Sequence, residues 1–86
     1  MSTETYNGWK NRQTWNVAMW IGNDYGIYTS AVEFMRKHRT HKNPYIGFIH
    51  SAGLLNERTP DKIAYESSRL DYKALNAMML ELVEGI

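Results

Sequence analysis

Polar capping residues and prolines divide this sequence into short helical segments, and this punctuation constrains the fold more than any other feature. Asn11 and Asp24 are residue types whose side chains accept hydrogen bonds from the free N–H groups of a first helical turn. Asn43-Pro44 adds proline at the first helical position, and Asp71 repeats the capping signal. We therefore expect helices over about residues 12–21, 25–39, 44–55 and 72–84.

The sequence signals for the ends of these helices are less regular than those for their starts. Gly22-Asn23 tolerates the left-handed backbone of a C-terminal cap and is expected to end the first helix. Thr59-Pro60-Asp61 repeats the start signal, but the apolar residues that follow it provide one helical turn at most before Ser67-Ser68. The segment 60–68 is therefore either a short helix or an extended stretch.

Each expected helix carries apolar residues at helical spacing. The first is apolar around much of its circumference, which is typical of a central helix. No segment shows the sustained alternation of a half-buried strand. We predict an all-α domain of four or five short helices packed around one small core, spanning residues 11–86 after a polar N-terminal tail and turn at 1–10.

Composition excludes several classes of protein. The chain has 86 residues, which suits a single domain, and it contains no cysteine. It is therefore neither a disulfide-stapled secreted scaffold nor a thiolate metal site. No apolar run approaches the roughly 20 residues of a membrane span, and the polar start differs from a signal peptide. We expect a cytoplasmic protein that does not bind membranes.

The sequence also lacks recognisable catalytic chemistry. It contains no glycine-rich phosphate loop, no nucleophile motif and no metalloprotease motif. His38 and His41 have no carboxylate at ligand spacing and are surrounded by cations, which would repel a metal ion, and His50 stands apart from them. We expect a protein that is not an enzyme and that binds neither a metal nor a cofactor.

All three tryptophans fall in one short stretch, at Trp9, Trp15 and Trp20. Tryptophan and arginine are enriched at binding hot spots, although a small core also needs large side chains. The positions 12, 16, 20 and 23 lie along one face of the expected helix, beside the face of 15, 18, 19 and 22. A partner-binding surface is therefore predicted at Trp9, Arg12, Asn16, Trp20, Asn23 and Asp24.

The predicted surface fixes which side chains of the first helix face the core and which face solvent. Trp15 and Met19 should face the core, whereas Arg12, Asn16 and Trp20 should be at least partly exposed. The indole N–H of Trp20 should then be available to a partner. The alternative is that the fold wraps the helix completely and that Asn16 bonds a neighbouring loop.

The stretch NGWKNRQTWNVAMWIGNDYG, residues 7–26, resembles the signature of a family of small, mostly uncharacterised proteins from bacteriophages, including cyanophages, and from some bacteria and archaea. The matching positions are Asn7, Gly8, Trp9, Asn11, Arg12, Thr14, Trp15, Val17, Trp20, Asn23, Asp24 and Gly26. Residues 70–76 resemble a second, weaker block of that family. The resemblance implies a phage or mobile-element origin and no general activity.

A basic segment follows the second expected helix. Four cations and two histidines occupy residues 36–42 without an acid, and residues 1–56 carry six Lys/Arg against three Asp/Glu. Such a local excess suits contact with nucleic-acid phosphates or with an acidic protein surface. The commoner interpretation of such a segment is a solvated helix end whose cations complement the helix dipole. The candidate residues are Arg36, Lys37, Arg39 and Lys42.

Three functions remain compatible with these patterns. The first is a small non-enzymatic phage-type protein that docks on a host or phage protein and modulates its activity. The second is a nucleic-acid-binding protein that uses the basic segment. The third is a self-associating component, for instance a homodimer, in which Met78 and Met79 give the last helix an adaptable apolar surface or else fill the core.

Overall fold

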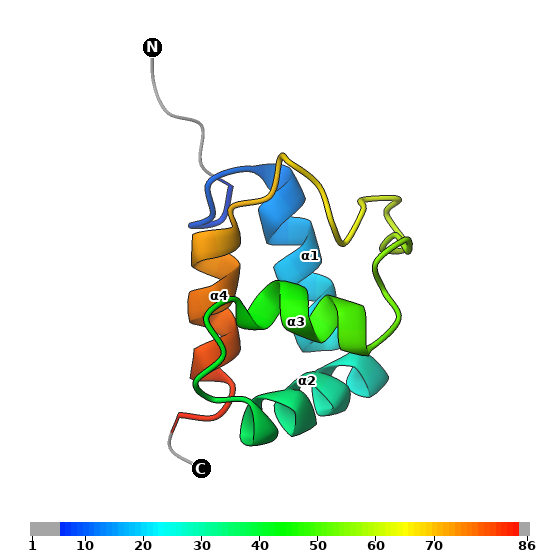
Figure 1. The fold of residues 1–86 in the computed structure, drawn as a ribbon. Coiled ribbons are helices and arrows are strands. Elements are labelled where there is room, and N and C mark those ends of the chain that lie inside the picture. The colour runs from blue at the N-terminus through cyan, green and yellow to red at the C-terminus, as the bar shows by residue number, and fades with distance from the viewer. Residues whose placement is uncertain (1–5, 85–86) are drawn as a thin grey trace.

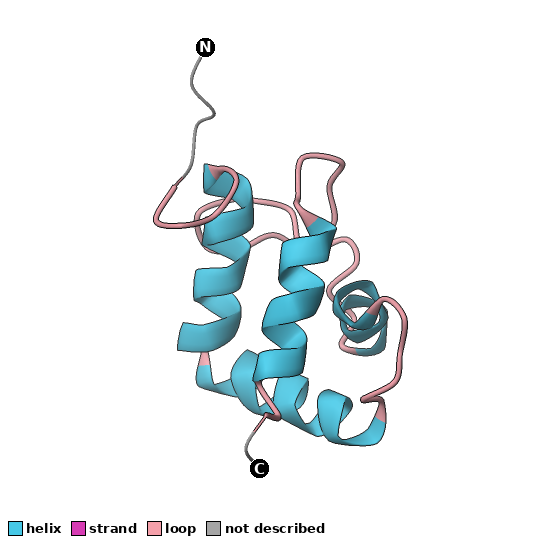
Figure 2. Ribbon diagram, turned by 90° about the vertical axis from the view of Figure 1, so that its left-hand side faces the viewer, coloured by secondary structure: helices cyan, strands magenta, loops and turns pink. Residues whose placement is uncertain are grey.

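The computed structural model describes residues 6–84 and confirms the all-α fold. Its helices are α1 (Arg12–Asn23), α2 (Tyr25–Lys37), α3 (Pro44–Ser51) and α4 (Tyr72–Glu81). Helices α1 and α4 lie side by side, α2 crosses the same end of both, and α3 packs across α4 and α2 (Figure 1, Figure 2). One core therefore lies between all four helices.

Three of the predicted helix starts are confirmed. The side chains of Asn11, Asp24 and Asp71 accept hydrogen bonds from the backbone N–H groups of Thr14, Ile27 and Ala74, respectively. Helix α3 differs, because Pro44 stands in its first turn but the Asn43 side chain makes no capping bond. The N–H of Tyr45 instead donates to Asn76 Oδ1 of α4, at 2.9 Å. The start of α3 is thus capped from a neighbouring helix.

The predicted end of α1 was wrong. Gly22 and Asn23 are helical and take no left-handed cap. The helix ends at Asp24, whose extended backbone (φ −88°, ψ 112°) turns the chain while its N–H still bonds the carbonyl of Trp20. Because the Asp24 side chain also caps α2, a single residue joins the two helices.

The other helices are shorter than predicted. Helix α2 ends at Lys37 and α4 at Glu81, two and three residues early. Helix α3 ends at Ser51 because Gly53 takes a left-handed φ of 74°, and Leu54 N–H closes the end by bonding the carbonyl of Ile49 at 2.9 Å. This is a glycine-terminated helix end, so the predicted continuation of the helix to residue 55 was wrong.

The segment 60–68 is not helical. Thr59 begins a tight turn in which its carbonyl accepts from Lys62 N–H at 2.7 Å, and Lys62 has a φ of 70°. A single antiparallel bridge then pairs Arg58 with Ala64. The predicted alternatives were a short helix and an extended stretch, and neither describes the whole segment, which consists of turns and bends around the one bridged residue Ala64.

The core is apolar, but α1 presents a different face to it from the one predicted. Its buried residues are Thr14, Asn16, Val17, Ala18 and Ile21. Trp15 and Met19 are only half-buried, so their placement in the core was wrong. The row of residues 14, 17, 18 and 21 faces inward. The other buried side chains of the core are Ala31, Met35, Tyr45, Phe48, Ile49, Tyr65, Leu70, Leu75, Met79 and Val83. Met79 thus fills the core, whereas Met78 is half-buried at its edge.

Two helical glycines provide a matched test of packing. A Cβ at Gly22 would meet nothing within 4 Å, whereas a Cβ at Gly47 would lie 2.8 Å from His41 Nε2 and 3.1 Å from Phe34 Cζ. Alanine is favoured over glycine in a helix by about 1 kcal/mol. Only Gly22 leaves room for that gain.

We therefore expect Gly22→Ala to raise the free energy of unfolding by up to about 1 kcal/mol. Gly47→Ala should give no gain or a loss, since the His41 ring must move away from α3. Urea unfolding of both variants measures the difference. Equal stabilisation by the two substitutions would contradict the close approach of His41.

Candidate functional site

Thr14 is a buried polar residue that joins the starts of two helices. Its hydroxyl donates to Asn11 Oδ1 at 2.6 Å and accepts from the N–H of Asp71 at 3.0 Å. Asn11 in turn donates from Nδ2 to the carbonyl of Arg69 at 2.7 Å. The first turn of α1 is thus bonded directly to the residues that lead into α4.

Asn16 is 1% exposed, so the prediction that it lies at the surface was wrong. Its Oδ1 accepts from the hydroxyl of Thr59 at 2.7 Å, and its Nδ2 donates to Asp61 Oδ2 at 2.8 Å. Buried amides need such partners, and here both lie in the 59–61 turn. The alternative interpretation, in which Asn16 bonds a neighbouring loop, describes the structure.

Trp20 is partly exposed, as predicted, but its indole N–H is already engaged. It donates to the same Asp61 oxygen at 2.9 Å. The bonds from Asn16 and Trp20, helped by the nearby charge of Arg12, lower the pKa of Asp61 from its ordinary value of 3.8. Asp61 is therefore ionised at neutral pH and serves as an anchor for the 59–61 turn.

Sequence reasoning missed Asp61 as a member of this cluster. Thr59-Pro60-Asp61 was predicted to start a helix, because the same residue types bond nearby backbone N–H groups in helix caps and in turns. The only signal in the sequence was a pair of hydrogen-bond donors on one face of α1, Asn16 and Trp20, which would need an acceptor when buried. Nothing in the local sequence identifies an acceptor more than forty residues away.

The remaining predicted partner residues do not form one continuous patch with Asn16. Arg12, Asn23 and Asp24 are exposed, and Asp24 also caps α2. Trp9 is half-buried and packs against the edge of the core. The structure therefore places these residues around α1, with Trp20 and Asn16 committed to the 59–61 turn.

A hollow of about 340 Å³ lies between α1 and α4 beside these residues. Trp15, Met19 and Met78, all half-buried, line it together with Trp9, Ala18, Gly22 and Asn23. Next to it, Asn7 and Gly8 take φ values of 49° and 89° and form the turn predicted there, which folds Tyr6 back onto Trp15 with ring centroids 4.8 Å apart. Trp9 and Trp15 thus line this hollow, whereas Trp20 does not.

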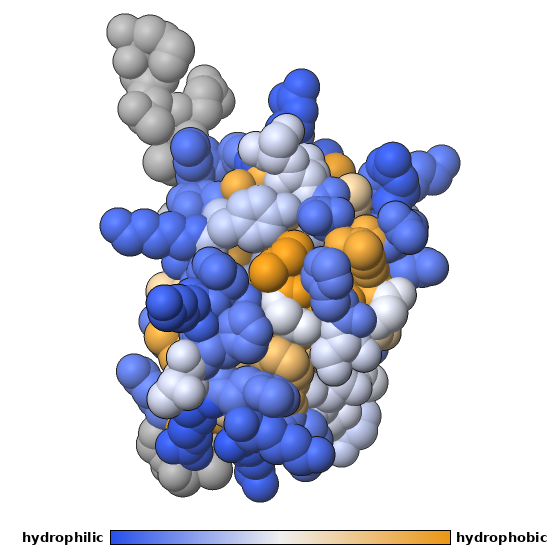
Figure 3. Space-filling model, viewed as in Figure 1, coloured by the Kyte–Doolittle hydropathy of each residue, from blue (hydrophilic) through white to orange (hydrophobic). Residues whose placement is uncertain are grey.

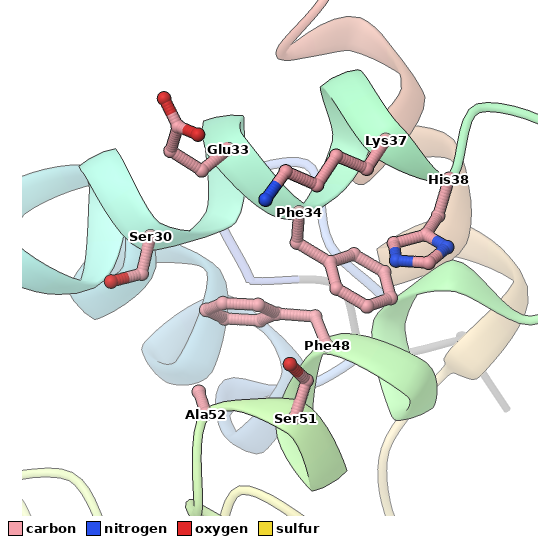
Figure 4. A pocket seen from close by; sticks show the side chains of 8 residues that line it. All are labelled: Ser30, Glu33, Phe34, Lys37, His38, Phe48, Ser51 and Ala52. Carbon is pink, nitrogen blue, oxygen red and sulfur yellow. The ribbon is translucent and has the colours of Figure 1, made fainter.

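The basic segment is exposed, as a solvent-facing or ligand-facing surface requires. Residues 36–43 are all exposed, including the candidates Arg36, Lys37, Arg39 and Lys42. Figure 3 shows hydrophilic residues gathered over this end of α2 and the loop that follows it. A hollow of about 420 Å³ adjoins the segment between α2 and α3, and its lining residues are Ser30, Glu33, Phe34, Lys37, His38, Phe48, Ser51 and Ala52 (Figure 4).

Two further observations concern metals and membranes. Within residues 6–84, no three histidine, aspartate or glutamate side chains are grouped so that they could hold a metal ion. None of the helices described is both long enough and apolar enough to cross a membrane.

Comparison with known proteins adds one finding. A family of unknown function, DUF7249, matches residues 2–85. The chain belongs to this family. No curated protein and no solved structure matches it significantly.

The polar cluster around Asn16 should be important for stability. In Asn16→Ala, the buried hydroxyl of Thr59 loses its acceptor, and we expect the free energy of unfolding to fall by about 1–3 kcal/mol. Gln13→Ala, a polar truncation on the same helix, should have a much smaller effect because Gln13 is only half-buried and its side chain makes no hydrogen bond within residues 6–84. Denaturant unfolding of both variants tests this difference, and similar losses would argue against a special role for Asn16.

Stability should also depend on pH through Asp61. Because the pKa of Asp61 is lower in the folded than in the unfolded chain, its contribution is present above its ordinary pKa and is lost as pH falls through the folded value. Asp61→Asn keeps an acceptor but removes the charge. We expect wild type to be more stable than Asp61→Asn near neutral pH and the two curves to converge in acid, and a constant difference across pH would refute the charge effect.

Proposed function

We propose that this protein is a small non-enzymatic phage-type binding protein that docks on a host or phage protein in the host cytoplasm and modulates its activity. The observation that carries this proposal is the hollow between α1 and α4, where large apolar side chains stay half-buried beside a filled core. The likeness of residues 7–26 to phage proteins supports the origin.

The chemistry of the hollow suits an apolar side chain of a partner protein. Trp15 and Met19 of α1 line it together with Met78 of α4, and Asn23 adds a polar group to the lining. Tryptophan and methionine are enriched at protein interfaces, and the flexible thioether of methionine adapts to a partner's shape. An apolar side chain of a partner that binds in this hollow would bury the exposed parts of Trp15, Met19 and Met78.

The titratable groups support a role in binding more than one in catalysis. Asp61 has a lowered pKa, so it is a poor general acid at neutral pH, and its bonds hold the 59–61 turn. Burial raises the pKa of Tyr45, whose hydroxyl donates to the carbonyl of Tyr65 at 2.6 Å inside the core. Both groups stabilise the fold.

Affinity capture from the natural host, followed by binding measurements on the purified partner, tests this proposal. Trp15→Ala removes a ring from the hollow, and Tyr25→Ala removes an aromatic ring that is 81% exposed on α2. For a hot spot, Trp15→Ala should weaken binding about thirtyfold, equivalent to about 2 kcal/mol, and Tyr25→Ala should leave it unchanged.

Thermal melts of both variants control for unfolding. A captured partner that binds Trp15→Ala as tightly as wild type would exclude this hollow as the docking site. Sedimentation of the protein alone separates partner docking from self-association, because a homodimer at high micromolar concentration would assign the same apolar surface to a second copy.

A further inference from the structure

Positive charge is concentrated on one part of the molecule. Residues 34–56 contain four cations and no acidic residue, whereas the rest of the chain carries six Lys/Arg and nine Asp/Glu. The net charge of +1 therefore conceals a basic stretch of sequence, which begins directly after Glu33. Such a separation directs a polyanion to the basic region and away from the remainder.

The turn that carries the cations has a defined conformation. The N–H of His41 bonds the carbonyl of His38 at 3.1 Å, and Nδ1 of the His41 ring accepts from the N–H of Asn43 at 3.0 Å. The ring of His41 lies close over Gly47 of α3, where a side chain would collide with it. Arg39 and Lys42 are thereby presented on an ordered turn next to the end of α2.

Aromatic rings lie directly beside these cations. Phe34 is half-buried and stacks on the exposed His38, with ring centroids 4.5 Å apart and planes inclined by 32°. Figure 4 shows the two rings at one side of the α2–α3 hollow, with Lys37 extending above them and Ser51 on the α3 side. The hollow thus combines an exposed flat ring, hydrogen-bonding groups and a cation.

We propose that this region binds single-stranded nucleic acid. Phosphates contact Arg36, Lys37, Arg39 and Lys42, and a base stacks on the His38 ring that Phe34 supports at the mouth of the hollow. Binding of single strands combines a cationic track with aromatic side chains, and it is tolerant of sequence because every base has a stacking face. The base must be unpaired to enter, so a duplex offers only its phosphates.

Glu33 favours this ligand over an acidic peptide. It stands on the rim of the hollow, one helical turn before Lys37. Its carboxylate repels a phosphate as well as a peptide carboxylate, but it can accept a hydrogen bond from the amino group of a base, which a glutamate side chain does not offer. The phosphates then lie on the side of the ring where the cations are.

Fluorescence anisotropy at about 50 mM salt tests the proposal, with three labelled probes: an oligodeoxycytidine single strand, whose bases carry the amino group, a duplex of equal length and a polyglutamate peptide. We expect the single strand to bind most tightly. Four phosphate contacts predict that log K falls with log salt with a slope of about −3. Absence of single-strand binding, tighter binding of the duplex, or tighter binding of polyglutamate would each overturn the proposal.

Matched variants separate the two parts of the site. Arg39→Gln/Lys42→Gln should reduce the salt slope by about 1.4, while Lys10→Gln/Lys73→Gln, which removes two exposed cations elsewhere, should leave it nearly unchanged. His38→Ala should weaken single-strand binding about tenfold through lost stacking, and His50→Ala should not. Equal effects within either pair would overturn the assignment.

This site is independent of the α1–α4 hollow, with which it shares no lining residue. Trp15→Ala should therefore leave nucleic-acid binding unchanged, and His38→Ala should leave protein docking unchanged. An experiment that excludes nucleic-acid binding would therefore not exclude protein docking, and the reverse also holds.

Discussion

The fold depends on two buried polar side chains in α1 that reach the distant half of the chain. Thr14 bonds the backbone at the start of α4, and Asn16 bonds both ends of the 59–61 turn. The chain between α3 and α4 has no helix of its own, so these bonds fix its course. A buried polar group left without a partner is costly, and the observed course of the chain provides partners for both side chains.

These bonds also explain which face of α1 points inward. Spacing alone favoured the row of Trp15, Ala18 and Met19, since apolar residues are expected in a core. The structure buries Ala18 of this row, but it buries Thr14, Asn16 and Val17 in place of Trp15 and Met19, which lie at the edge of the core. Periodicity cannot predict this, because the benefit of burying Thr14 and Asn16 depends on partners far away in the sequence.

The features that the sequence did predict are local ones. The Asn11, Asp24 and Asp71 caps each bond a backbone N–H three residues on, so the signal and its partner lie in the same short segment. The turn at Asn7-Gly8 and the exposure of the basic segment follow from nearby residues as well. The role of Asp61 and the capping of α3 by Asn76 needed the fold, because each joins separate segments.

The stretch 7–26 therefore divides into residues that build the fold and residues that the fold leaves free. Asn7, Gly8, Asn11, Thr14, Trp20 and Asp24 each form a turn, a cap or a long-range bond. The side chains of Trp15, Met19 and Asn23 form no turn, cap or long-range hydrogen bond within residues 6–84, and all three line one hollow. A half-buried tryptophan ring leaves a large apolar area accessible in a small protein, and the proposed docking of a partner rests on this area.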